Sequence, residues 1–102
     1  METVLISGGD GLLAKELKKC NPKGFKIVKL SRKKLDTSNR SDTLTEVCRY
    51  KPDIFIHCGA MTTPMKEHED NPYPSIRQNI VGTANVALAC LTWNVKQILL
   101  RI

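Results

Sequence analysis

Three glycines fall within four positions near the start of the chain, in the segment ISGGDGLLAKEL. Gly8, Gly11 and Ala14 give the spacing Gly-x-x-Gly-x-x-Ala, after an apolar run and at the start of a helical pattern. In such a turn, the first glycine permits a tight bend, the second lets backbone approach a pyrophosphate, and the small third residue allows close packing. The N–H groups of Leu12 and Leu13 would then face the phosphates. The segment predicts a dinucleotide site, with a plain strand-to-helix turn as the alternative.

A basic turn, Ser31-Arg32-Lys33-Lys34, follows the second apolar run about 20 residues past the glycines. An acidic residue here would hold the ribose 2′-hydroxyl of NAD, whereas an arginine beside a hydroxyl suits a 2′-phosphate. Ser31 and Arg32 therefore indicate NADP, with NAD left open. The alternative is that Arg32, Lys33 and Lys34 form a solvated turn, which is the interpretation we adopt for Lys33 and Lys34. Asp36 comes late for the ribose, so it either faces the adenine amino group or starts the following helix.

Other residue types that support chemistry are scattered along the chain. The four cysteines are far apart, and no Cys-x-x-Cys or Cys-x-x-His spacing occurs, so we expect core residues rather than metal ligands or disulfides. We interpret His57 as a strand-end residue with satisfied hydrogen bonds and His68 as a solvated one. The sequence therefore predicts no metal site and no catalytic role for His57 or His68.

Strands and helices that could position these residues alternate along the chain. Short β-branched or alternating runs predict strands at residues 3–7, 26–30, 53–58 and 95–100. A further short edge strand is expected at residues 33–37, in place of one crossover helix. The expected architecture is an α/β Rossmann-like three-layer sandwich, with a parallel sheet of order 3-2-1-4-5 and helices on both faces.

Three helices are expected between these strands. The second covers residues 39–51, where Asn39 can cap the first turn and Asp42 favours the positive end of the dipole. The third runs from about Ser75 to Thr92. The apolar positions expected to face the core are Leu12, Leu13, Ala14 and Leu17 in the first helix and Ile76, Ile80, Ala84, Leu88 and Leu91 in the third.

The length and the charge distribution of the chain limit the classes of function that it can have. The chain has 102 residues, enough for one domain, and residues 1–40 hold ten Lys and Arg against four Asp and Glu, while residues 41–102 hold six of each. With 5% aromatic residues and no recognition helix, nucleic-acid binding is disfavoured. The longest uncharged stretch is interrupted by polar residues and no signal peptide is visible, so we expect a cytoplasmic protein without a membrane partner.

Four ordered segments carry a resemblance that covers nearly the whole chain: SGGDGLLAKEL, KLDTSN, KPDIFIHCGAMT and NPYPSIRQNIVGTANVALAC. They resemble the amino-terminal part of the extended short-chain dehydrogenase/reductase superfamily of sugar-nucleotide epimerases, dehydratases and reductases, nearest to the dTDP-dehydrorhamnose reductases. The resemblance departs at Ala14 and Gly59, both small. It implies a site in which Leu35, Asp36 and Thr37 lie at the adenine and Asn79 lies near the active site. The segment that passes under the cofactor ribose would contribute Cys58, Gly59, Ala60 and Thr62.

The proton donor of this superfamily is a tyrosine in a Tyr-x-x-x-Lys pair, and neither Tyr50 nor Tyr73 has a lysine four positions later. The resemblance therefore implies that residues 1–102 form an incomplete NAD(P)-binding domain, inactive alone, with a sugar nucleotide as partner only where the remaining half is present. A non-catalytic dinucleotide-binding or regulatory module of the same superfamily is the alternative. Because half of such a fold leaves an apolar sheet edge or face uncovered, we also expect self-association.

Overall fold

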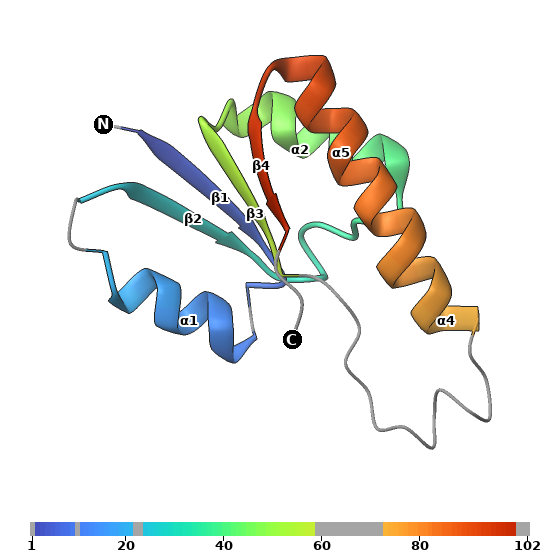
Figure 1. The fold of residues 1–102 in the computed structure, drawn as a ribbon, viewed down its shortest axis with the longest axis horizontal. Helices are drawn as coiled ribbons and strands as arrows, with labels where there is room; N and C mark the ends of the chain where they lie inside the picture. The colour runs from blue at the N-terminus through green and yellow to red at the C-terminus, as the bar shows by residue number, and fades with distance from the viewer. Residues whose placement is uncertain (1, 10, 22–23, 59–72, 100–102) are drawn as a thin grey trace.

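The structure is a computed structural model that describes residues 2–9, 11–21, 24–58 and 73–99. Strands and helices alternate along the chain (Figure 1). In chain order they are β1 (Thr3–Ser7), α1 (Leu12–Lys19), β2 (Lys26–Leu30), α2 (Arg40–Tyr50), β3 (Ile54–His57), α4 (Tyr73–Ile76), η1 (Arg77–Val81), α5 (Gly82–Trp93) and β4 (Lys96–Leu99).

The strands form one parallel sheet of order β2-β1-β3-β4. Ser7, the last residue of β1, lies level with Leu30 at the end of β2 and with His57 at the end of β3. Three carboxyl-terminal strand ends therefore meet at one edge of the sheet. The predicted parallel α/β fold is confirmed, and these four strands have the relative order that was expected of them.

The expected edge strand at residues 33–37 is wrong. After β2 the chain turns, because the backbone N–H groups of Lys34 and Leu35 both donate to the carbonyl of Ser31, at 3.0 and 2.9 Å. Leu35 is then buried in the core beside Val47 of α2. The local turn and the burial of Leu35 replace pairing with β2, so the described sheet has four strands.

Two apolar clusters lie on opposite faces of the sheet, which makes three layers. Figure 1 shows α1 on one side of the strands and α2 with α5 on the other. Ala14 of α1 packs with Val4 and Ile6 on the first face. The larger cluster, on the second face, contains Leu5, Leu30, Leu35, Val47, Phe55, Val86, Ala89 and Cys90.

The second helix begins as its sequence predicts. The Asn39 side chain accepts a hydrogen bond from the Asp42 backbone N–H at 3.0 Å, which satisfies one of the free donors of the first turn. The helix ends where Lys51 takes the left-handed conformation, with φ of 45°. Helix α5 ends in the same way at Asn94, with φ of 55°.

The expected apolar faces of the other helices need correction. The last helical stretch begins at Tyr73, two residues before the expected start, and contains a π-helical segment, η1. Ile80, Ala84 and Leu91 are exposed, and Leu12 of α1 is 77% exposed. The side of α5 that packs inward consists instead of Gly82, Asn85, Val86, Ala89 and Cys90.

Within the described residues, no helix is both long and apolar enough to cross a membrane.

Candidate functional site

The glycine turn connects β1 to α1 at the edge where the strands end. Gly8 has φ of 68°, a left-handed conformation that glycine adopts without strain, and its carbonyl accepts a hydrogen bond from the Gly11 N–H at 2.9 Å. The Gly9 N–H donates to the Leu30 carbonyl at 2.9 Å, which ties the turn to the end of β2. The turn and the start of the basic segment are therefore neighbours.

Gly9 has a role that the spacing motif does not include. A Cβ atom at Gly9 would lie 2.9 Å from both the backbone nitrogen of Leu30 and the Cβ of Lys29. Because one of these neighbours is backbone and neither atom is the end of a flexible side chain, a side chain at residue 9 would force the turn away from β2. The only signal in the sequence was the extra glycine itself.

Helix α1 presents an uncapped amino terminus to this turn. Gly11 precedes the helix in an extended conformation, with φ of −72°, and no side chain caps it. The first turn contains no acidic residue, while Lys18 and Lys19 occupy the last turn. The backbone N–H groups of a first turn and the positive end of the helix dipole together attract anions. This end of α1 therefore has the properties of a phosphate site.

The basic turn after β2 adds positive charge near the same edge. Ser31 is half-buried, and Arg32, Lys33 and Lys34 are exposed. Within the described part of the chain, the Arg32 guanidinium makes no ion pair. Its donors are therefore available for an anionic ligand beside the glycine turn.

Asp36 and Thr37 lie in a hydrogen-bonded loop that contacts α5. The Asp36 carboxylate accepts hydrogen bonds from the backbone N–H and the hydroxyl of Ser38, at 3.0 and 2.7 Å, so it shapes the turn before α2. Thr37 is buried, and its carbonyl accepts a hydrogen bond from the Asn85 side-chain amide at 2.9 Å. A Cβ at Gly82 would lie 2.9 Å from the Thr37 hydroxyl, so α5 approaches this loop closely.

Ser7 and His57 form a buried polar pair at the ends of β1 and β3. The Ser7 Oγ and His57 Nδ1 atoms lie 2.7 Å apart, and His57 is 1% exposed. Burial lowers the pKa of His57, which favours the neutral ring. Its Nε2 atom is a buried polar atom with no hydrogen-bond partner among the described residues. The expectation that both ring nitrogens are satisfied is therefore wrong for Nε2, which is left as a donor or acceptor for another group.

The remaining predicted site residues are only partly placed. Cys58 follows β3, is half-buried, and has a pKa raised by burial, as expected of an unreactive thiol. Asn79 lies half-buried in η1, three residues before Gly82. Gly59, Ala60, Thr62 and His68 fall outside the described residues. All four cysteines are free, and no cluster of His, Cys, Asp or Glu among the described residues could hold a metal ion.

These features together fit a dinucleotide phosphate group. A cofactor phosphate needs a turn without side chains, free N–H donors and positive charge, which Gly8, Gly11, α1 and Arg32 supply at one edge. The orphaned His57 Nε2 adds a polar atom at the same ends of the strands.

Comparison with known proteins identifies the family. Residues 1–100 match the family described as the RmlD substrate binding domain. The chain belongs to this family. A dTDP-4-dehydrorhamnose reductase from Bacillus anthracis, solved in complex with NADP, is 33% identical with a TM-score of 0.88, and the match covers 95% of this chain and 35% of that one. An orthologous reductase from Clostridium acetobutylicum is 25% identical with a TM-score of 0.84, over 93% of this chain and 34% of that one.

A curated relative extends the comparison of this RmlD-family chain. The Probable polysaccharide biosynthesis protein EpsC of Bacillus subtilis is 28% identical over 89 residues, which are 86% of this chain and 14% of that protein. The RmlD-family chain thus spans about a third of the length of the two reductases and a smaller part of this relative. The resemblance to dTDP-dehydrorhamnose reductases that the four sequence segments carry is confirmed.

Proposed function

We propose that residues 1–102 form the NADP-binding part of a sugar-nucleotide reductase similar to dTDP-4-dehydrorhamnose reductase. The observation that carries this proposal is the uncapped amino terminus of α1, which follows a glycine turn hydrogen-bonded to Leu30, two residues before Arg32. The B. anthracis reductase, which is 33% identical and shares the fold, was solved with NADP.

In this proposal, different residues bind different parts of the cofactor. Leu12 and Leu13 contribute backbone N–H groups to the pyrophosphate, over a turn that Gly8 and Gly11 keep free of side chains. Arg32 and Ser31 bind the 2′-phosphate, because a guanidinium and a hydroxyl are both donors. The adenine lies by Asp36 and Thr37, the ribose by Cys58, Gly59, Ala60 and Thr62, and Asn79 lies toward the nicotinamide end.

Bound NADP(H) would supply hydride chemistry, whereas the described residues bind and orient the cofactor. Tyr50 is partly buried against the core, and Tyr73 has Arg77 rather than lysine four residues later. Neither therefore matches the expected proton donor. The same observation favours a second candidate, a non-catalytic module that binds the dinucleotide without turnover. The four free cysteines, including the exposed Cys20, support a reducing compartment such as the cytoplasm for either candidate.

The test is a calorimetric titration of the chain with NADPH, NADH and 2′,5′-ADP, which carries the 2′-phosphate but no nicotinamide. We expect NADPH to bind more tightly than NADH, and 2′,5′-ADP to compete with NADPH for one site. If none of the three binds at millimolar concentration, the cofactor proposal is wrong. If NADPH and NADH bind with equal affinity, the proposed pyrophosphate site at α1 stands, but Arg32 does not bind the 2′-phosphate.

A further inference from the structure

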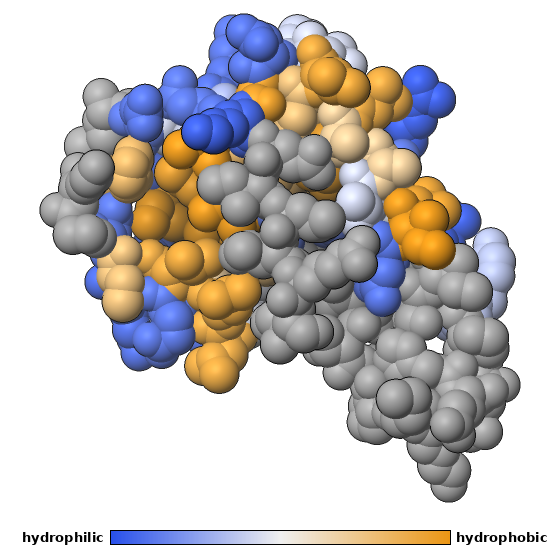
Figure 2. All heavy atoms as spheres, in the orientation of Figure 1, coloured by the Kyte–Doolittle hydropathy of each residue, from blue (hydrophilic) through white to orange (hydrophobic). Residues whose placement is uncertain are grey.

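Helix α5 carries a polar residue on the side that packs inward. Asn85 is 8% exposed and lies on that side with Val86 and Ala89. The outer side is apolar instead, since Leu91 is 81% exposed and Figure 2 shows hydrophobic side chains at the surface over α5. Burial of an amide costs free energy unless its hydrogen bonds are made. The presence of Asn85 at this position is therefore explained by the hydrogen bond that it forms.

The Asn85 amide holds the middle of the loop between β2 and α2. Its Nδ2 atom donates to the Thr37 carbonyl at 2.9 Å, across 48 positions of the sequence. Thr37 is 1% exposed, so without Asn85 its carbonyl would lose a donor where water does not reach. The Thr43 hydroxyl is a longer contact to the same carbonyl, at 3.5 Å. The amide therefore ties α5 to this loop.

Gly82 lies almost one turn earlier on the same side of α5 and lets the helix approach the loop. A Cβ at residue 82 would lie 2.9 Å from the Thr37 hydroxyl oxygen and 3.5 Å from the Thr37 Cβ. Gly82 has no positive φ, so the position requires the missing side chain and not a special backbone conformation. The hydrogen bond from Asn85 and the close approach at Gly82 thus fix the same residue from the same helix.

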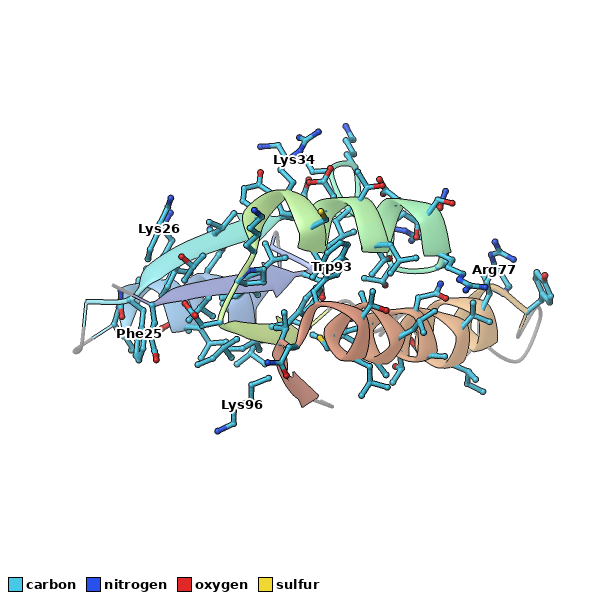
Figure 3. The ribbon with its side chains drawn as sticks, turned by 90° about the horizontal axis from the view of Figure 1, so that it is seen from above. Phe25, Lys26, Lys34, Arg77, Trp93 and Lys96 are labelled. Carbon is cyan, nitrogen blue, oxygen red and sulfur yellow. The ribbon has the colours of Figure 1, made fainter. Side chains whose placement is uncertain are left out.

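The two ends of the loop are held in other ways. Leu35 is buried in the core, and the Asn39 side chain caps the first turn of α2. Neither anchor uses Asn85 or Gly82. Figures 1 and 3 both show α2 and α5 side by side, so α5 reaches the segment that leads into α2. A change at this end of α5 would therefore move residues 36–38 while both ends of the loop stay in place.

We propose that Asn85 and Gly82 are positioning residues for the adenine end of the cofactor, which act by fixing Thr37 from the core side of its loop. The inference rests on the proposed function, in which the adenine lies by Asp36 and Thr37. The Asp36 carboxylate is bonded to Ser38, on the other side of Thr37. Displacement of Thr37 would therefore move the Asp36 carboxylate as well. Affinity for the adenine end is then set in part by a helix outside the cofactor site.

The first test is calorimetric titration of Asn85→Ala with 2′,5′-ADP and with inorganic pyrophosphate. We expect 2′,5′-ADP to bind about fivefold to tenfold more weakly, comparable to the loss of one ordinary hydrogen bond. Pyrophosphate, which would bind at the start of α1, should bind as before. The matched control is Val86→Ala, which truncates the next buried residue of α5. It should lower the melting temperature and leave the affinity for 2′,5′-ADP unchanged.

A second variant, Gly82→Ala, keeps the Asn85 amide and displaces Thr37 with an added methyl group. Alanine favours a helix more than glycine does, so this chain should stay folded even if Asn85→Ala does not. We expect the same pattern, a weaker affinity for 2′,5′-ADP and an unchanged affinity for pyrophosphate. A loss of affinity without a loss of stability cannot come from general unfolding.

Amide hydrogen exchange gives a readout that needs no ligand. The backbone N–H groups of Ser38 and Asn39 both donate to Asp36. Both should exchange faster in Asn85→Ala, whereas the Asp42 N–H, which the Asn39 side chain caps, should exchange as in the wild type. Uniformly faster exchange along α2 would instead indicate general destabilisation and would overturn the proposal.

The titrations separate this inference from the proposed function. A wild-type chain that binds neither 2′,5′-ADP nor NADPH would overturn both. If the wild type binds 2′,5′-ADP and Gly82→Ala and Asn85→Ala bind it equally well, only the role of α5 is wrong. An equal loss of affinity in Val86→Ala, or an equal loss for pyrophosphate, would show that Asn85 serves the stability of the fold alone.

Discussion

Arg32 is the residue that decides between the two nicotinamide cofactors in the proposed site. It is exposed, lies two residues after the Leu30 carbonyl that binds Gly9, and has no ion-pair partner among the described residues. Lys33 and Lys34 are equally exposed. Their charge adds to the local field, but only the fork of a guanidinium matches phosphate geometry with two parallel hydrogen bonds.

Replacement of Arg32 by aspartate is expected to weaken NADPH binding by about 1.5–3 kcal/mol, the range for a hydrogen bond to a charged group. NADH has no 2′-phosphate, so its affinity should change much less. Calorimetry with both cofactors measures the difference. Lys34→Asp is the matched control, because it makes the same change of charge two residues away and should affect NADPH less. An equal loss for both cofactors would show that Arg32 does not contact the 2′-phosphate.

His57 is expected to make stability depend on pH. Burial lowers its pKa in the folded chain below the ordinary value near 6.5, so the unfolded chain binds more protons between those two pKa values. This contribution to stability is present above about pH 6.5 and is lost as the pH falls toward the folded pKa. Urea unfolding from about pH 7.5 to pH 5 should therefore show a smaller decline for His57→Asn, which cannot titrate and can still accept from Ser7. Parallel curves for the two chains would contradict this account.

At the scale of elements, the turn between β1 and α1 contains two glycines that are required for different reasons. Gly9 is packed against β2, where a Cβ would meet backbone at 2.9 Å. Gly11 has an extended φ that other residues can adopt, and a Cβ there would meet the Gly8 carbonyl at 3.2 Å. Gly9 is therefore required for packing on β2, whereas a side chain introduced at Gly11 would enter the proposed phosphate position.

Gly11→Val is expected to abolish the rise in melting temperature that NADPH causes, while it lowers the unliganded melt less than Gly9→Ala does, because its Cβ would lie 3.2 Å from backbone and that of residue 9 would lie 2.9 Å from backbone. A ligand that binds only the folded state raises the midpoint, so the lost shift reports lost binding. Gly9→Ala provides the contrast, because overpacking costs about 1–3 kcal/mol and lowers the unliganded melt itself. If NADPH still raises the melting temperature of Gly11→Val, the segment between β1 and α1 is a plain turn and not a phosphate site.

The strands were predictable because their apolar runs are short, β-branched and separated by clear breaks. The buried face of α5 was not predictable. The helix has no charged residue, so the periodicity of its apolar residues cannot distinguish the inner stripe from the outer one. The segment at residues 33–37 was misread as a strand, since a turn closed on the Ser31 carbonyl begins there and Leu35 and Thr37 are buried without pairing with β2. At the site, the spacing of Gly8 and Gly11 was readable, whereas the contact of Gly9 with β2 depends on residues about 20 positions away.

At the scale of the whole molecule, the proposed function gives residues 1–102 a role in cofactor binding and assigns them no proton donor. The carboxyl ends of β1, β2 and β3 meet at one edge, which is where ligands of open α/β sheets bind. Residues 1–102 contain this edge, but the match covers only about a third of the similar reductases. Neither Tyr50 nor Tyr73 lies in a Tyr-x-x-x-Lys pair.

The 102-residue chain is therefore expected to bind NADPH and not to oxidise it in the presence of a 4-keto sugar nucleotide. Hydride transfer to a carbonyl needs a positioned acid to protonate the developing oxyanion, a contribution of about 10²–10⁴-fold, as well as a substrate held in line with the nicotinamide. Loss of NADPH absorbance with dTDP-4-dehydrorhamnose measures turnover, and the B. anthracis reductase provides the positive control under the same conditions. A rate that rises in proportion to the concentration of the chain, and that disappears in Gly11→Val, would show that residues 1–102 contain a proton donor of their own. Of the groups described here, the buried pair of Ser7 and His57 would then be the first to test.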